Sequence, residues 1–480
     1  MPKITPYMKQ CFVTAAIGFN IIGHGAASGF PAILLPQLHQ PDSGFKLTRS
    51  QDSWLASTVG LTLLLGSFSA ASVMGTKGRK AAHYTISVLG IVGWVITILA
   101  TSFWLLIVGR IILGISFVMM IPLRSALIGE YTSPKSRGAF LATVSLAQGF
   151  GIFFVHLIGS LISWQRTALV CLFLPFISLV MTLFSPESPS WLASQGRYEE
   201  SREAFRWLRG DQEEDELEKM ISARIAFKES RQGRKITMFG TIKKKEFYKP
   251  IILMFHAYSL SQSCGLVTMA AFSTIIIKKV MGDVNADMWM VIFDTERILT
   301  NTLAVFIIHK FKRRTMMFSA GGLSLASHIG IIFYVYLRNN NSLPVTGMWL
   351  PALLLALQFF AMSVGVTPMP SVMAGEVFPL QYRSLAGSIS LVSLSSTMFL
   401  ILKTFTGLID SVGIEGTYAV YSFSIAYCLL VMWFLMPETK GKTLQEIEDG
   451  FRGKPIVTRE LIEKKSLKDD ETELETKNLT

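Results

Sequence analysis

The chain has 480 residues, of which 50% are hydrophobic and 16% charged, and its formal net charge is +12. The apolar residues occur in blocks of about 20, the length that crosses a bilayer, which a water-soluble chain of this size would not show. Lysine and arginine lie between the blocks, where they set membrane orientation, and this distribution argues against nucleic-acid binding. Because lipid offers the backbone no hydrogen bonds, the blocks are expected to be helices.

The apolar blocks predict an all-α membrane protein with twelve transmembrane helices in two six-helix halves. The spans are expected at 11–36, 54–74, 83–102, 105–128, 139–162, 166–184, 249–276, 286–309, 316–337, 348–374, 385–409 and 414–436. The halves then comprise residues 1–184 and 249–448.

A polar stretch at 185–248 separates the halves. It is expected to form cytosolic linker helices, because 198–208 and 213–227 have a helical pattern. The tail at 449–480 is expected to be cytosolic and largely disordered, since it has mixed charge and few apolar residues.

Basic loops fall on one side of this topology, which predicts that this side and both termini are cytosolic. A multi-pass location in the plasma membrane is expected. Asn340-Asn341-Ser342 is an N-glycosylation sequon on the opposite face.

Short polar motifs after the spans recur six helices later. They are Gly78-Arg79-Lys80 with Lys312-Arg313-Arg314, Glu130 and Arg137 with Glu376 and Arg383, and Pro186-Glu187-Ser188 with Pro437-Glu438-Thr439. Two parallel six-helix halves are typical of membrane carriers.

From the first span to Glu448, these motifs resemble the sugar porter family of the major facilitator superfamily. The chain is most similar to its insect facilitated trehalose transporters, on Ser53-Trp54 and on Lys403-Thr404-Phe405. The resemblance implies a major facilitator fold and transport of a small-molecule sugar by alternating access. It implies no catalytic residue, no cofactor and no metal.

The recurring charges are interpreted as a cytosolic gate that holds the inner side shut in one state. Its members are Arg79, Lys80, Glu130, Arg137, Glu187, Arg313, Arg314, Glu376, Arg383 and Glu438. A single exposed ion pair contributes only about 0–1 kcal/mol, so a gate needs a network. The alternative is that these charges only set orientation, but orientation does not require the recurring acidic residues.

The resemblance also assigns a central substrate site, where this chain departs from the family. The seventh span keeps only Gln262 and Gly265 of the family's amide-rich run, and the family's aromatic residues in the tenth and eleventh spans are absent. Pro368 and Pro370 remain and are expected to break the tenth helix. The candidate site residues are Gln262, Ser261, Gly265, Ser145, Gln148, Arg297, Thr367, Ser371 and Ser395.

The eighth span carries charges inside an apolar block. Arg297 follows Asp294 by three residues, a spacing that permits an ion pair, either in the site or as a structural pair near the end of the span. His24 and His156 are interpreted as neutral packing residues. The first span has no acidic residue, whereas similar proton-coupled sugar porters carry one there, so uniport is favoured.

Three hypotheses follow. The first is a facilitative uniporter of trehalose or a hexose. The second is a proton-coupled or non-sugar carrier, suggested by Arg297 and the depleted site. The third is a sugar sensor that does not transport. An enzyme is not expected, because no nucleotide-binding loop or nucleophile triad occurs.

Overall fold

The computed structural model of the chain describes ten ranges. They are residues 5–41, 45–66, 69–210, 217–218, 221–222, 244–308, 310–340, 348–378, 383–442 and 444–453. Within them, the side chains of 69–72, 134–139, 142, 383–385 and 444–445 are not described. The secondary structure within these ranges is helical.

The first half contains helices at all six predicted spans. They are α1 (Pro6–Leu38), α2 (Arg49–Gly66), α3 (Ser69–Thr76), α4 (Arg79–Ile98), α5 (Phe103–Tyr131), α6 (Pro134–Leu161) and α7 (Trp164–Leu183). The second span consists of α2 and α3 together. The others are single helices that extend beyond the predicted bounds at one or both ends.

The second half also has helices at each of its predicted spans. They are α12 (Lys245–Ser263), α13 (Thr268–Ala271), α14 (Ser273–Met281), α15 (Ala286–Ile307), α16 (Arg313–Asn339), α17 (Trp349–Ala361), the π-helix η2 (Met362–Val366), α18 (Pro368–Glu376) and α19 (Arg383–Leu435). α19 holds the last two spans, and Gly413 breaks it with a φ of +73°.

Two spans are interrupted. The seventh is not one helix, because the backbone turns after α12, where Gly265 has a φ of +107° that favours glycine. The expected break of the tenth span is confirmed. η2 precedes Pro368, whose missing N–H interrupts helical hydrogen bonding.

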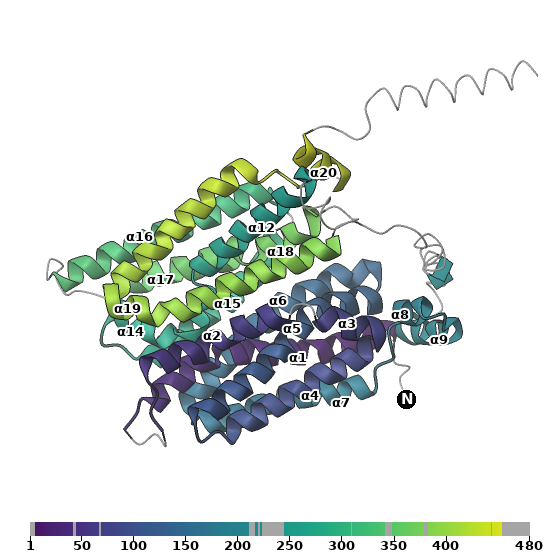
Figure 1. Ribbon diagram of the computed structural model, residues 1–480, viewed down its shortest axis with the longest axis horizontal. Helices are drawn as coiled ribbons and strands as arrows, with labels where there is room; N and C mark the ends of the chain where they lie inside the picture. Colours follow the sequence, from purple (N-terminus) through teal and green to yellow (C-terminus); the bar gives the residue numbers. More distant parts are fainter. Residues whose placement is uncertain are drawn as a thin grey trace, which may run out of the picture.

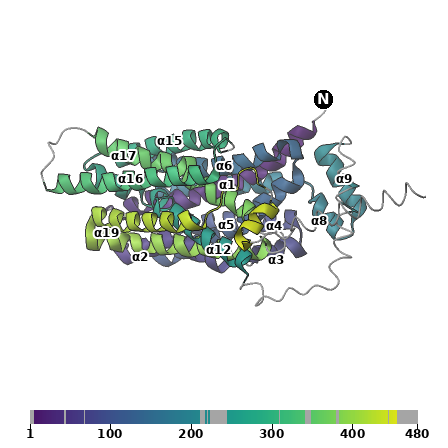
Figure 2. The same cartoon turned by 90° about the horizontal axis from the view of Figure 1, so that it is seen from above.

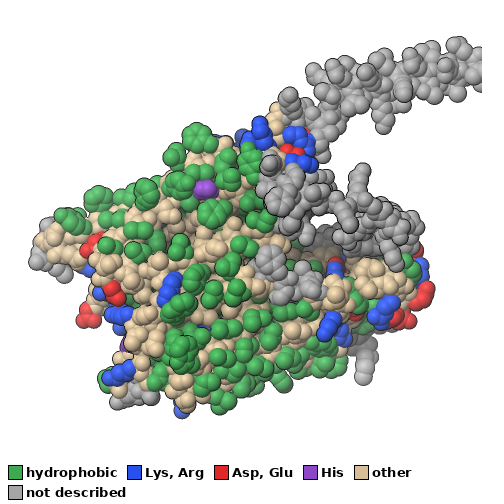
Figure 3. Space-filling model, viewed as in Figure 1, with side chains coloured by type: hydrophobic (Ala, Val, Ile, Leu, Met, Phe, Trp, Pro, Cys, Tyr) green, Lys and Arg blue, Asp and Glu red, His purple; other side chains and the backbone are tan. Residues whose placement is uncertain are grey.

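The flanks of the molecule are apolar. Figure 3 shows hydrophobic side chains spread along the helices, and Phe423 and Phe434 are among those exposed. Nine helical stretches among the described residues are long and apolar enough to cross a membrane. In this count α12 with α13, α17 with η2 and α18, and α19 are one stretch each. Such flanks are expected to face lipid.

The two halves lie side by side (Figure 1). The helices outside the spans gather at one end of the bundle, which we call the linker end (Figures 1 and 2). They are α8 (Pro189–Ser194), α9 (Tyr198–Arg209) and α20 (Leu444–Arg452). α9 confirms the helix predicted at 198–208. The helix predicted at 213–227 lies almost entirely outside the described residues, and so does most of the tail.

The halves meet toward the opposite end, which we call the far end. There α1 packs against α13 and α14, α2 against α19, and α6 against α15. Thr274 on α14 donates a hydrogen bond of 3.1 Å to the carbonyl of Ala32, and Lys403 on α19 donates one of 2.8 Å to the hydroxyl of Ser53. The described contacts between the halves therefore close the far end.

Candidate functional site

The linker end of the first half carries a charge network between α4, α5 and the segment before α8. Arg79 binds Glu130 through Nε and Nη2, each at 3.0 Å from a carboxylate oxygen. The carboxylate of Glu187 accepts the backbone N–H of Arg79 at 3.0 Å and that of Lys80 at 3.1 Å. Glu187 therefore binds the first turn of α4, where helix N–H groups lack partners.

The second half repeats this network. Arg313 binds Glu376 at 3.1 Å, and Glu438 accepts the backbone N–H of Arg313 at 3.0 Å and that of Arg314 at 3.2 Å. Burial acts to raise the pKa of Glu438, but hydrogen bonds from backbone N–H groups outweigh it and hold the pKa below its usual value. The internal repeat seen in the sequence is thus reproduced in the bonding.

The two copies differ at one backbone position. Gly78 has a φ of +98°, and a Cβ built on it would lie 2.3 Å from a carboxylate oxygen of Glu187. Lys312 stands at the matching position with a φ of −67°, an ordinary extended conformation. The missing glycine of the second copy therefore costs no backbone strain.

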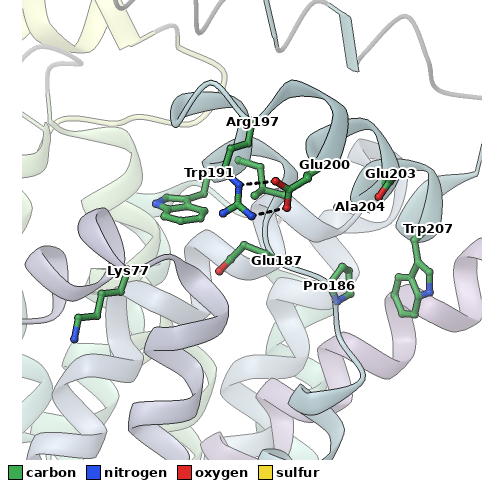
Figure 4. Close-up of a pocket in the computed structure, with 10 residues that line it drawn as sticks. Lys77, Pro186, Glu187, Trp191, Arg197, Glu200, Glu203, Ala204 and Trp207 are labelled. Carbon is green, nitrogen blue, oxygen red and sulfur yellow. Dashed lines mark hydrogen bonds and ion pairs between the residues drawn. The ribbon is translucent and has the colours of Figure 1, made fainter.

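Each of these bonds joins residues of the same half or, for Glu187, joins the first half to the linker segment that directly follows it. The side chains of Arg137 and Arg383 are not among those that the structure describes, so the cytosolic gate stays a prediction. Beside the first network, a surface pocket of about 430 Å³ is lined by Glu187 and by Arg197, which is paired with Glu200 (Figure 4).

Three candidate substrate residues of the second half, Ser261, Gln262 and Gly265, lie at the break in the seventh span. Ser261 and Gln262 are buried in the last turn of α12. Gln358 on α17 donates to the carbonyl of Cys264 at 3.0 Å and accepts the hydroxyl of Tyr418 at 3.2 Å. The sequence prediction missed Gln358 and Tyr418, although a buried amide in an apolar span was a usable signal.

Several buried polar atoms on neighbouring elements have no hydrogen-bond partner among the described residues. They include Oε1 of Gln262 and the hydroxyls of Ser259, Ser363 and Thr367. α12 packs against η2 and α18, so these atoms belong to elements in contact. Buried polar groups are nearly always satisfied, which makes such atoms candidates for binding a polar solute.

The remaining predicted site residues are more scattered. Ser145 and Ser371 are exposed, on α6 and α18, and Gln148 is half-buried on α6. Ser395 is buried, and its hydroxyl donates to the carbonyl of Leu391 at 2.7 Å within its own helix.

The predicted ion pair in the eighth span is confirmed. Nη2 of Arg297 lies 2.8 Å from Oδ1 of Asp294, and both side chains are almost completely buried. The other carboxylate oxygen of Asp294 is bonded to Nδ1 of His156 on α6. His156 is buried and hydrogen-bonded, as expected of a packing residue, but its carboxylate partner comes from the opposite half, which the sequence did not predict.

The sequence analysis also missed Arg124. It is half-buried on α5 and lies within electrostatic reach of Tyr258 on α12 and His24 on α1. Within the part of the chain that is described, Arg124 makes no hydrogen bond or ion pair. A charge inside an apolar block was the signal that could have found it.

Comparison with known proteins identifies the family. The profile of the sugar (and other) transporter family matches residues 10–451. The chain belongs to this family. It is 24% identical over 443 residues to a facilitated trehalose transporter of Polypedilum vanderplanki, covering 92% of this chain and 87% of that protein. The corresponding protein of Bombyx mori is 25% identical over 442 residues, covering 92% and 86%.

Solved structures of sugar transporters share the fold. The xylose transporter XylE from E. coli, in a partially occluded inward-open conformation, superposes with a TM-score of 0.73 at 16% identity, covering 90% of this chain and 99% of that one. The chain is thus a multi-pass membrane carrier with the twelve-helix major facilitator fold.

Proposed function

We propose that this carrier is a facilitative uniporter of a neutral sugar, trehalose or a hexose, in the plasma membrane with its linker end in the cytosol. The observation that carries the proposal is the set of buried, uncharged polar atoms without partners on α12, on η2 and on Thr367, which joins η2 to α18. Sugars present many hydroxyls and no charge, and amide and hydroxyl groups can both donate to and accept from them.

The transport cycle follows from the contacts between the halves. Because α1, α2 and α6 pack against the second half at the far end, we expect the sugar to enter and leave from the linker end in this state. Opening the far end requires these contacts to break while the linker ends approach. The charge networks at the linker end, whose Arg and Glu partners now lie within each half, would then bind across it.

Uniport is supported by the first span. α1 contains no Asp or Glu, so it offers no carboxylate that would carry a proton with the sugar. Transport is therefore expected to follow the sugar gradient alone.

Uptake of radiolabelled trehalose, glucose and fructose into proteoliposomes tests the proposal. We expect saturable uptake of at least one of them, unchanged when the pH gradient is collapsed. Gln262→Ala is expected to raise the half-saturating concentration about 2- to 12-fold, the equivalent of one hydrogen bond of 0.5–1.5 kcal/mol. Gln195→Ala, an exposed amide outside the site, is the matched control. No flux of any of the three sugars would refute the proposal.

A second candidate is a carrier of an anionic, hydroxyl-rich solute. Arg124 favours it, because this cation on α5 has no carboxylate partner among the described residues and lies near Tyr258 of the other half. Including glucuronate in the uptake panel separates the candidates. Glucuronate uptake that is abolished by Arg124→Gln would support the anion carrier, and exclusive uptake of neutral sugars would exclude it.

A further inference from the structure

A buried histidine joins the two halves of the carrier at the far end. His156 on α6 contacts Asp294 on α15 through Nδ1, while its Nε2 lies 3.1 Å from the carbonyl oxygen of Gly29 and 3.2 Å from that of Ala270. Gly29 belongs to the first half, and Asp294 and Ala270 to the second. The imidazole side chain has no solvent exposure.

The hydrogen-bonding partners of His156 determine how many protons this site holds. A neutral imidazole has one N–H donor and one acceptor nitrogen, and a carbonyl oxygen only accepts. Nε2 faces two carbonyl oxygens, so it must carry a hydrogen. Nδ1 faces a carboxylate, so the pair needs another proton between them, on the imidazole or on the carboxyl group. The site therefore holds one more proton than a neutral histidine beside an ionised aspartate.

The surrounding charges place this proton in the contact between the halves. On α15, Asp294 faces His156, and Nη2 of Arg297 lies 2.8 Å from the other carboxylate oxygen of Asp294. α1 and α13 face it with backbone carbonyls, and His24 on α1 is directed instead to Ser116 of α5 at 2.9 Å. When the halves separate, Arg297 stays beside Asp294 on the same helix and keeps it ionised, whereas His156 loses its carboxylate.

Close packing around the imidazole of His156 also indicates that the fold is shaped to hold it. A Cβ on Gly29 would lie 2.9 Å from Nε2 of His156, so only glycine lets the imidazole approach the Gly29 carbonyl of α1. A larger residue there would push the ring away from its contacts with Gly29 and with the second half.

We propose that His156 and Asp294 form a proton-binding latch, which takes up one proton when the far end closes and releases it when the far end opens. The proposal goes beyond uniport but uses the proposed orientation, in which the far end is outside. Because the closed site is sealed, the proton returns to the side from which it came. External acid is therefore expected to favour the inward-facing state without driving net proton transport.

The magnitude follows from linkage. A water-exposed imidazole is mostly neutral above a pH of about 6.5, so closing the far end then requires one proton. The ratio of closed to open far ends should rise by at most about tenfold for each pH unit that is lowered toward 6.5, and level off below it.

Spin labels at Gln40 and Lys279, exposed positions on opposite halves at the far end, report this ratio as two distance populations in nanodiscs. The half-buried Cys11 is first replaced by alanine. From pH 8.5 to 6.5 we expect a rising closed population in the parent protein and no pH dependence in His156→Gln. Asp294→Asn should also abolish it, because an amide can donate to a neutral imidazole.

His39→Asn is the matched control. His39 also pairs with an aspartate, Asp52 at 2.9 Å, but both belong to the first half, so this variant should keep the pH dependence. A flat profile in the parent protein would overturn the proposal, and so would a persistent slope in His156→Gln. If His156→Gln does not fold, the pH profiles of the parent protein and of Asp294→Asn test the proposal instead. The distances do not depend on sugar flux, so a failure of the uptake assay leaves this result intact.

Discussion

Gly60→Ala is expected to bias the carrier away from the inward-facing state. Gly60 lies on α2 where it contacts α19 of the other half, and a Cβ built on it would lie 2.7 Å from the backbone nitrogen and 2.8 Å from the Cα of Phe399. Optimal carbon contacts are about 3.5–4.0 Å. Since a backbone cannot rotate away as a side chain can, the helices must separate by roughly 1 Å to reach that distance.

Overpacking of this kind costs about 1–3 kcal/mol, and it acts only while α2 and α19 touch. The helix-forming preference of alanine applies in both states and cancels. The ratio of closed to open far ends should therefore fall about 5- to 150-fold.

The distance between labels at Gln40 and Lys279 measures this ratio, at constant pH. Gly18→Ala on α1 is the control, because a Cβ there meets nothing within 4 Å. An unchanged distance distribution in Gly60→Ala, or an equal shift in Gly18→Ala, would refute the reasoning.

Three further predictions concern packing and charge. Lys403→Met should weaken the closed far end by about 1–2 kcal/mol, because Nζ of Lys403 lies 4.0 Å from the ring centre of Trp54 in the other half. The distances between the two spin labels should lengthen, and an unchanged distance distribution would count against this contact. Gly25→Ala should lower the thermal stability of the carrier by at least 1–3 kcal/mol, because its Cβ would lie 2.3 Å from a carbonyl oxygen of α6 within the same half; melting at the parent temperature would contradict this. Glu438→Gln should lower thermal stability by about 1 kcal/mol at neutral pH. The pKa of Glu438 is lower in the folded protein than in the unfolded chain, where it is about 4.3. Its stabilising effect is therefore present above the unfolded-state pKa and is lost as the pH falls through the folded-state pKa. The difference from the parent should shrink in acid, while Glu200→Gln, at an exposed pair, should show little difference at any pH.

The sequence predicted the architecture well for a physical reason. A bilayer requires long apolar helices, and basic loops mark one side, so the spans and the internal repeat can be read directly from residue order. The repeat predicted two matching sets of charged residues, and the bonds of Arg79 with Glu130 and of Arg313 with Glu376 occupy matching places in the two halves. The break at Pro368 followed from the missing N–H of proline.

The site was harder to predict, because its contacts join residues far apart in the chain. His156 and Asp294 are separated by 138 positions, and no local pattern pairs them. Gln358 lies inside an apolar run, and Arg124 lies at a position to which the family resemblance assigns no role. The turn at Gly265 depends on a single left-handed residue, which hydropathy does not reveal.

Counterflow tests the central claim most directly, that this chain moves a sugar by alternating access. Proteoliposomes are loaded with unlabelled sugar, and entry of the labelled sugar is followed. A carrier returns faster to the outside when it is loaded, so the account predicts accelerated, transient accumulation of label above equilibrium. Sugar binding without any accumulation would contradict the account and identify a sensor instead.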